Sequence, residues 1–326
     1  MPHVLIIGAG FSGCTVANEL AGCDVKVTIA EKSDKLGGKV RNYGCKATDK
    51  CNNCGVCLAG GLWEKTENNS NIDIIYNSKL VDMTGKQGDF SAKLKTREGM
   101  RSINNLSAIV VAAGFEESSV PFGHLIIERM TGIIRGLDLE KLCMDRSGDA
   151  LFDKKPAGVA FIQCVGSRDK NENSGCSRVC CGYSTRAAKV IRQIYPECRI
   201  TFFYMEMQAV SQGDYFRHLK EDIDIEFIKC RPLKITGGEP VIIEYEEPAR
   251  GRQVKCEFDY VVLSEGINPP EDSFILAEIC GLGQDKNGFL KPGGGVFVTG
   301  CAKQPAKIEE VFADSVAVAK QIRREI

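Results

Sequence analysis

VLIIGAGFSG, residues 4–13, joins an apolar run to a glycine-rich turn, and apolar residues at helical spacing follow it. The run predicts a buried parallel strand. The turn has the G-x-G-x-x-G pattern that holds a dinucleotide pyrophosphate at a helix N-terminus. In this pattern Gly8 makes the tight turn, Gly10 lets the backbone approach the pyrophosphate, and Gly13 lets helix and strand pack closely. The stretch therefore predicts an α/β fold with a dinucleotide site near its start.

The residues after this turn complete the pattern. A second apolar strand is expected from Val25 to Ala30, and Glu31 at its end is placed to accept hydrogen bonds from ribose hydroxyls. The next segment, LGGK at residues 36–39, resembles the Gly-Gly segment of flavoproteins with two dinucleotide-binding domains, the thioredoxin reductase and glutathione reductase type. This resemblance favours FAD over NAD and implies a thioredoxin reductase-like fold.

Two later segments fit the same resemblance, AIVVAAG at residues 108–114 and GVFVTG at residues 295–300. In flavoproteins of this type the last strand ends in Gly-Asp, and the acid holds the ribityl chain of FAD. Here Cys301 stands where that acid would be. The candidate cofactor-binding residues are Gly8, Gly10, Phe11, Ser12, Gly13, Glu31, Lys32, Gly38, Lys39, Ala113, Gly114, Gly300 and Cys301.

The composition of the 326-residue chain is that of an ordinary soluble protein, with 42 basic and 43 acidic residues. We expect no nucleic-acid partner, because such partners select a strongly basic surface. Direct membrane insertion is not expected either, because no run approaches the roughly 18 consecutive apolar residues that cross a bilayer. Sixteen cysteines in a chain of this class indicate metal or redox chemistry in the cytoplasm rather than disulfides.

The middle of the chain repeats the strand-helix-strand order without a second glycine motif. A strand is expected at residues 159–163, a helix at 183–194 and a strand at 199–204. Between the first strand and the helix lie CVGSRD, residues 164–169, and CSRVCC, residues 176–181. Four thiols in so short a window suit a [4Fe-4S] cluster, with zinc as the competing metal and buried unligated thiols as the simplest alternative. Adjacent cysteines favour iron.

These two cysteine segments closely resemble the signature of the A-type subunit of heterodisulfide reductase, a thioredoxin reductase-like flavoprotein family with a [4Fe-4S] cluster near FAD. The resemblance implies that the second nucleotide site is replaced by an iron-sulfur cluster loop. Its implied ligands are Cys164, Cys176, Cys180 and Cys181. In larger relatives a lysine approaches the flavin at the position of Arg186, where a guanidinium could stabilise an anionic reduced flavin.

The resemblance also implies partners. It is to the short form of the family, as in sulfur-oxidising heterodisulfide reductase-like systems and quinone-interacting complexes. We therefore expect a homodimer that works with B- and C-like subunits of the heterodisulfide reductase type.

A second group of cysteines follows the Gly-Gly turn at Cys45, Cys51, Cys54 and Cys57. A C-x2-C-x2-C core with a fourth cysteine nearby is common around cubane clusters, so a second cluster is one interpretation. The alternatives are a redox-active disulfide between Cys45 and Cys51, as glutathione reductase-type enzymes carry after the same turn, and structural thiols.

The expected organisation is discontinuous. An FAD-binding domain is predicted at residues 1–117 and 259–326, a linker at 118–155, and a degenerate NAD(P)-type domain with the cluster at 156–258. The favoured function is an electron-transfer subunit that relays electrons between FAD, the cluster and thiol, disulfide or sulfur-compound partners. A stand-alone flavin disulfide reductase and a mainly structural subunit remain as alternatives.

Overall fold

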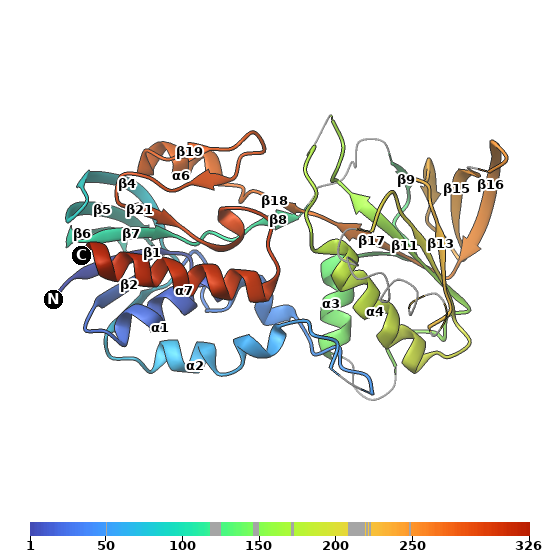
Figure 1. Ribbon diagram of the computed structural model, residues 1–326, viewed down its shortest axis with the longest axis horizontal. Helices are drawn as coiled ribbons and strands as arrows, with labels where there is room; N and C mark the ends of the chain where they lie inside the picture. The colour runs from blue at the N-terminus through green and yellow to red at the C-terminus, as the bar shows by residue number, and fades with distance from the viewer. Residues whose placement is uncertain are drawn as a thin grey trace. The chain divides into compact units, whose positions relative to one another are not determined.

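The computed structural model describes residues 1–49, 51–117, 125–145, 150–170, 173–207, 219, 221, 223–247 and 249–326. The chain divides into two units, each assembled from separate segments (Figure 1). The first unit contains Met1–Arg41, Gly55–Glu116 and Asn268–Ile326, and the second contains Asn42–Cys54 and Glu117–Ile267. The chain passes between them at the short strands β8 (Glu116–Glu117) and β18 (Ile267–Asn268) and on either side of residues 42–54.

The first unit is built on a parallel sheet with the strand order β21-β7-β1-β2-β3. Its strands are β1 (His3–Ile7), β2 (Lys26–Ala30), β3 (Ile72–Ile75), β7 (Ala108–Val111) and β21 (Val296–Val298). The chain runs outward from β1 to β3 and then returns to β7 on the other side of β1. This reversal is the topological switch point, where ligands bind beyond the carboxyl ends of the strands in open α/β sheets.

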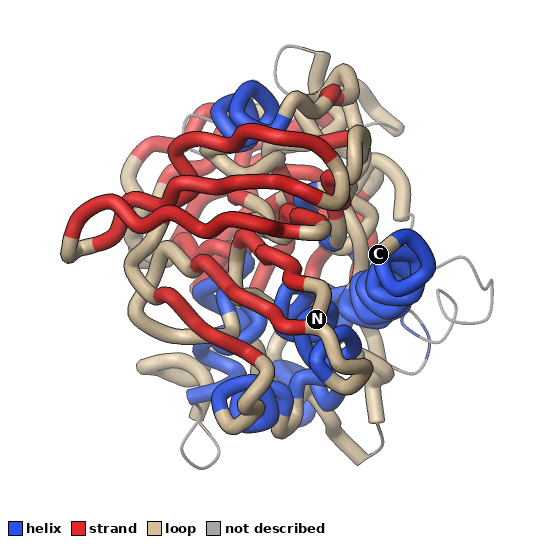
Figure 2. The backbone as a smooth tube through the Cα atoms, turned by 90° about the vertical axis from the view of Figure 1, so that its left-hand side faces the viewer, coloured by secondary structure: helices blue, strands red, loops and turns tan. Residues whose placement is uncertain are grey.

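Helices and a small antiparallel sheet cover the two faces of this parallel sheet. Val4 and Ile6 pack among residues of α1 (Phe11–Ala21) and α7 (Ile308–Glu325), whereas Leu5 and Ile7 pack toward the opposite face, because side chains alternate along a strand. That opposite face meets an antiparallel sheet and a helix: β4 (Lys79–Lys86), β5 (Asp89–Thr96), β6 (Gly99–Leu106) and α6 (Ser273–Cys280). Both termini lie at the same end of this unit (Figures 1 and 2).

The remaining elements of the first unit are short. They are η1 (Gly38–Asn42), whose last residue belongs to the second unit, η2 (Val56–Ala59), α2 (Leu62–Glu67), β19 (Gly283–Gln284), β20 (Leu290–Lys291) and η3 (Gly300–Ala302). No helix within the described ranges is both long and apolar enough to cross a membrane.

The second unit has a parallel sheet of its own, with the strand order β10-β17-β11-β12-β13. Its strands are β10 (Ile133–Arg135), β11 (Gly158–Val165), β12 (Arg199–Phe203), β13 (Ile225–Ile228) and β17 (Tyr260–Glu265). One face packs on α3 (Gly136–Asp145) and α4 (Cys180–Ile194), and the other on a second sheet. That sheet consists of β9 (Ile126–Glu128), β14 (Lys234–Thr236), β15 (Val241–Glu247) and β16 (Arg252–Phe258).

The unit boundaries differ from the predicted domains. Strand β17 was placed in the FAD-binding domain, but it pairs with β10 and β11 in the second unit. The predicted linker contains β9, β10 and α3, and residues 42–54 join the second unit. An apolar run shows that a strand is buried on both faces, but it does not show which of two parallel sheets the strand enters.

Candidate functional site

The glycine turn after β1 has the close contacts that its pattern predicts. Gly8 has a φ of 102°, and a Cβ there would lie 2.5 Å from the Ala112 carbonyl oxygen. A Cβ on Gly13 would lie 2.0 Å from the Gly8 carbonyl oxygen, so helix and strand pack too tightly for any side chain. A Cβ on Gly10, by contrast, would meet nothing within 4 Å. The backbone of Gly10 thus faces open space at the amino end of α1, as a pyrophosphate requires.

The residue after Gly10 has a packing role. Phe11 is buried beside Val311 and Ala59, and its ring lies 6.4 Å from the ring of Phe312. Its side chain therefore packs α1 against α7.

The carboxylate of Glu31 organises the end of β2. Glu31 is only 7% exposed, and its Oε2 accepts a 2.6 Å hydrogen bond from the backbone N–H of Ala9. Its Oε1 accepts bonds from the backbone N–H and the hydroxyl of Ser33 at 2.8 and 2.7 Å. The acid predicted to meet a ribose therefore also fixes the glycine turn, and Ser33 is a supporting residue that the glycine motif does not indicate.

The Gly-Gly turn lies against the first glycine turn. The N–H of Gly37 donates to the Ala9 carbonyl oxygen at 2.8 Å, and a Cβ on Gly38 would lie 3.3 Å from the Gly10 Cα. Gly114, which follows Ala113 beyond the end of β7, has a φ of 78° and open space around its missing Cβ. These glycines leave a backbone-lined cradle at the switch point of the first sheet.

Two predicted lysines lie beside this cradle and share one acid. Lys39 Nζ lies 3.2 Å from a Glu116 carboxylate oxygen and 5.3 Å from the centre of the Phe115 ring. Lys32 Nζ lies 3.8 Å from the other Glu116 oxygen, and both lysines remain partly exposed. Both ammonium groups are therefore held near the turn without being buried.

The turn after β21 meets the start of α1. Gly300 has a φ of 66°, and a Cβ there would lie 2.9 Å from both Cβ and Oγ of Ser12. Cys301, at the position of the expected acid, donates its thiol to the Ala306 carbonyl oxygen at 3.6 Å. Burial raises the pKa of this thiol to about 11. Cys301 is therefore a neutral thiol and does not replace a carboxylate.

The first cysteine group lies at the carboxyl end of β11 in the second unit. The pairing of β11 with β17 shifts register between Ile162 and Val165, and Cys164 within this bulge has a φ of 62°. Arg168 and Arg178 also adopt positive φ values, 56° and 63°. Such conformations are costly for residues other than glycine, and they cluster where a structure holds a functional group in a set orientation.

The thiols of this group interact with one another. The Cys164, Cys180 and Cys181 side chains are each at most 2% exposed. Hydrogen bonds with Cys164 and Cys181 raise the pKa of Cys180, while the bond with Cys180 lowers the pKa of Cys164. The half-buried Cys176 accepts a 3.3 Å bond from the Arg178 N–H, although burial raises its pKa. All four predicted ligands thus lie in one loop and the first turn of α4, and Cys164 most readily supplies the thiolate that metals bind.

Two buried serines hold this loop on the sheet. Ser167 and Ser177 share a 2.8 Å hydrogen bond, and Ser177 Oγ accepts the N–H of Ile267 at 2.8 Å. A Cβ on Gly266 would lie 2.0 Å from Ser167 Oγ, so only glycine fits there. Within the ranges that the structure describes, no group of three or more His, Cys, Asp or Glu residues has the arrangement of a metal site.

The second cysteine group spans a unit boundary, with Cys45, Cys51 and Cys54 in the second unit and Cys57 in η2 of the first. Cys45, Cys51 and Cys57 are exposed, and Cys54 is half-buried.

Arg186 holds the loop of this second group. Its Nε and one terminal nitrogen donate to the carbonyl oxygens of Asn52 and Asn53, each at 2.9 Å. These two bonds direct the guanidinium to the cysteine loop, a contact that no sequence pattern indicates.

Comparison with known proteins identifies this geometry. Residues 6–69 match the family described as NAD(P)-binding Rossmann-like domain. The T. acidophilum thioredoxin reductase structure aligns over 100% of this chain and 99% of that one, with a TM-score of 0.68 and 17% identity. The flavoprotein disulfide reductase RclA from Escherichia coli aligns over 98% of this chain and 70% of that one, with a TM-score of 0.65 and 15% identity. These structures confirm the predicted two-dinucleotide-binding-domain flavoprotein fold.

The curated relatives are longer proteins, and both are A-type subunits. That of the H(2):CoB-CoM heterodisulfide,ferredoxin reductase of Methanothermobacter thermautotrophicus is 31% identical over 97% of this chain and 62% of its own length. An iron-sulfur subunit of the CoB–CoM heterodisulfide reductase of Methanopyrus kandleri is 24% identical over 97% of this chain and 63% of its own. The chain thus spans about three-fifths of these relatives. It is a flavoprotein like the A-type subunit of heterodisulfide reductase, with a thioredoxin reductase-like fold.

Proposed function

We propose that this chain is an oxidoreductase subunit that binds FAD and a [4Fe-4S] cluster and relays electrons between them and partner proteins. The observation that carries the proposal is the loop after β11. In a fold built for two dinucleotides, that loop presents four clustered cysteines where the second glycine motif would stand. The cluster would supply one-electron transfer, and the flavin would exchange one or two electrons.

The residues of the first unit fit FAD. The open backbone at Gly10 and Gly114, in contact with the Gly-Gly turn, forms a cradle that a Cβ at either position would enter. Glu31 is fixed by the Ala9 N–H and Ser33, so its carboxylate is already oriented toward the turn. In this role the glycine turn holds the pyrophosphate, Glu31 the ribose, and Lys32 and Lys39 add positive charge nearby.

The residues of the second unit fit a cluster by donor type and placement. Soft iron prefers thiolate ligands, and Cys164, Cys176, Cys180 and Cys181 offer four in one loop and the start of α4. Arg168 donates a hydrogen bond to Cys164, which favours its ionised form. The low solvent exposure of three of the four would limit solvent access and so influence the potential.

The names of the relatives support a role within a larger complex, because each is an A-type subunit of a heterodisulfide reductase. We propose that the chain works in the cytoplasm as a homodimer. It would pass electrons to B- and C-like subunits, which act on thiol, disulfide or sulfur compounds. For Cys45, Cys51, Cys54 and Cys57 we propose a second cluster; a Cys45–Cys51 disulfide would instead make the chain a stand-alone disulfide reductase.

Cofactor quantification after anaerobic purification tests the proposal. About four irons and four sulfides per FAD would indicate one cluster, and about eight of each would indicate two. Cys164→Ser and Cys180→Ser should each remove the iron of the first cluster, while Cys198→Ser, at a buried cysteine outside both groups, should leave it unchanged. A wild-type protein that binds flavin but no iron would overturn the electron-relay function.

A further inference from the structure

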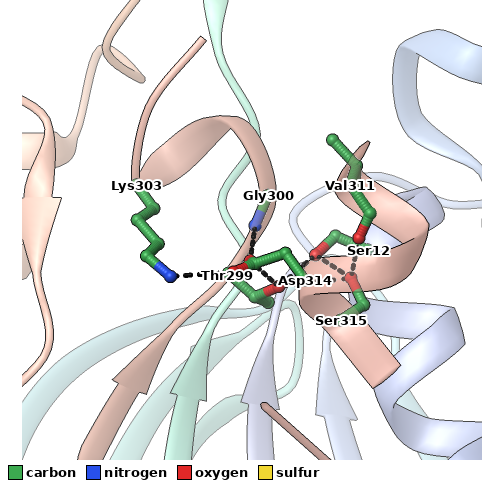
Figure 3. A network of polar contacts seen from close by, with 7 residues as sticks. All are labelled: Ser12, Thr299, Gly300, Lys303, Val311, Asp314 and Ser315. Carbon is green, nitrogen blue, oxygen red and sulfur yellow. Dashed lines mark hydrogen bonds and ion pairs between the residues drawn. The ribbon is translucent and has the colours of Figure 1, made fainter. Parts of the chain in front are cut away.

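The turn after β21 lacks the acid that its position predicts, yet an acid from another element holds it. Asp314, on α7, accepts hydrogen bonds through Oδ2 from the N–H of Gly300 at 3.1 Å and from the Thr299 hydroxyl at 2.8 Å. Lys303 Nζ lies 2.7 Å from Oδ1 of the same carboxylate (Figure 3). Both oxygens are thus bound to the turn itself.

The same network reaches the start of α1. Ser12 Oγ donates to Thr299 Oγ1 at 3.1 Å and lies 3.0 Å from Ser315 Oγ. Ser315 in turn donates to the Val311 carbonyl oxygen at 2.7 Å (Figure 3). Thr299 and Ser315 are fully buried, so these hydrogen bonds are shielded from water. The network therefore connects β21, α7 and the helix whose amino end forms the glycine turn.

This connection lies at the switch point. Thr299 N–H donates to the Val111 carbonyl oxygen at 3.1 Å, and the N–H of Ala112, the residue after β7, donates to the Ile7 carbonyl oxygen at 2.8 Å. The ends of β21, β7 and β1 are thus joined in sequence, and η3 follows directly. Because Gly300 already packs closely on Ser12, even a small shift of this turn would change the space beside the glycine turn.

We propose that Asp314 is a positioning residue for the FAD site, which sets the Gly300–Ala302 turn against the start of α1 in place of the missing acid. This inference rests on the proposed FAD function. Asp314 acts through the turn, because its oxygens already accept Gly300, Thr299 and Lys303. Cys301 cannot do this work, since its neutral thiol bonds to Ala306.

The position of the turn separates two halves of the ligand. The ADP half is expected at the Gly8–Gly13 turn and Glu31, whereas the turn after β21 lies beyond the end of a different strand. Disturbing Asp314 should therefore weaken the binding of FAD more than the binding of ADP. A general loss of structure would weaken both alike.

The test is calorimetric titration of the apo form of the full chain with FAD and with ADP. Asp314→Asn should weaken FAD about tenfold, or about 1.4 kcal/mol, and leave ADP within about twofold. Thr299→Val, which removes the other bond to Oδ2, should act in the same direction. Ser315→Ala is the matched control, because Ser315 lies in the network but does not bond to Gly300.

Each outcome separates the two proposals. If wild-type protein binds FAD and Asp314→Asn binds it equally tightly, the positioning role is wrong while the FAD function stands. Equal weakening of FAD and ADP would also overturn the role, because it would show a global effect. A wild-type chain that binds ADP but shows no preference for FAD would overturn the proposed FAD function, and the inference with it.

Discussion

The Nε of Arg186 donates a 2.9 Å hydrogen bond to the carbonyl oxygen of Asn52. Arg186 lies on α4, whose first residues are Cys180 and Cys181, and Asn52 lies between Cys51 and Cys54. One guanidinium thus connects the helix of the first cysteine group to the loop of the second. Both segments belong to the second unit, so the two groups share one structural support.

Removing this guanidinium should loosen the loop. We expect Arg186→Ala to speed hydrogen exchange at residues 51–54 about five- to tenfold, because two hydrogen bonds to the loop worth about 1 kcal/mol each are lost. Mass spectrometry of exchanged peptides measures the effect. Arg192→Ala is the control, since Arg192 lies on the same helix but bonds to Pro196 and Asp224. Unchanged exchange in Arg186→Ala would refute the connection.

A buried ion pair anchors the same segment nearby. Lys46 and Glu140 bond directly, with side chains only 4% and 9% exposed. Lys46→Met should destabilise the second unit by about 3–5 kcal/mol, because it leaves a buried carboxylate without its partner. The double variant Lys46→Met/Glu140→Leu should recover most of that loss. Urea unfolding followed by circular dichroism measures both, and equal stability of the single and double variants would contradict this account.

Glu265 should make stability depend on pH. Burial raises the pKa of this carboxyl to about 7, despite Arg135 at 2.7 Å. The folded protein therefore binds a proton that the unfolded chain releases near its ordinary pKa of 4.5. The resulting stabilisation is complete below pH 4.5 and is lost as the pH rises through about 7.

Thermal unfolding from about pH 4.5 to 8 checks this direction. Glu265→Gln should flatten the decline over this range, because the amide has no proton to lose. Glu117→Gln, at the other acid beside Arg135, should preserve the wild-type slope. A Glu265→Gln slope equal to that of the wild type would show that Glu265 does not titrate in this range.

Glu31 should matter to nucleotide affinity through its own hydrogen bonds. Glu31→Gln replaces one acceptor oxygen by a donor, so it cannot serve both Ala9 and Ser33 as the carboxylate does. We expect ADP to bind about 10- to 100-fold more weakly, the effect of losing a charged hydrogen bond of about 1.5–3 kcal/mol. Fluorescence titration measures the affinity. Asp34→Asn, an exposed acid close in sequence, should bind as the wild type does.

Local patterns were enough to predict most elements of the fold. The strand and glycine turn of residues 4–13, the helix before β12 and the carboxyl-terminal helix were all predicted near their observed bounds. Each has a short-range signal, such as an apolar run or helical spacing. Strand β17 was assigned to the wrong sheet, because both parallel sheets accept the same Val-rich run.

The site shows a similar division. Gly8, Gly13 and Glu31 follow from a motif whose spacing carries its geometry. Asp314 was missed because it lies on a different element from Gly300, in a helix with no motif around it. The Lys46–Glu140 pair joins residues 94 positions apart, and no local pattern indicates such a contact. Long-range partners of this kind require the folded chain.

The most direct test of the central claim is an anaerobic reductive titration of the full chain, followed by flavin absorbance and by electron paramagnetic resonance. The account predicts that electrons added to the wild-type protein distribute between flavin and a cluster signal. It also predicts that Cys180→Ser loses the cluster signal while its flavin still reduces. A wild-type protein whose flavin reduces without any iron-sulfur signal appearing would contradict the claim that this chain relays electrons.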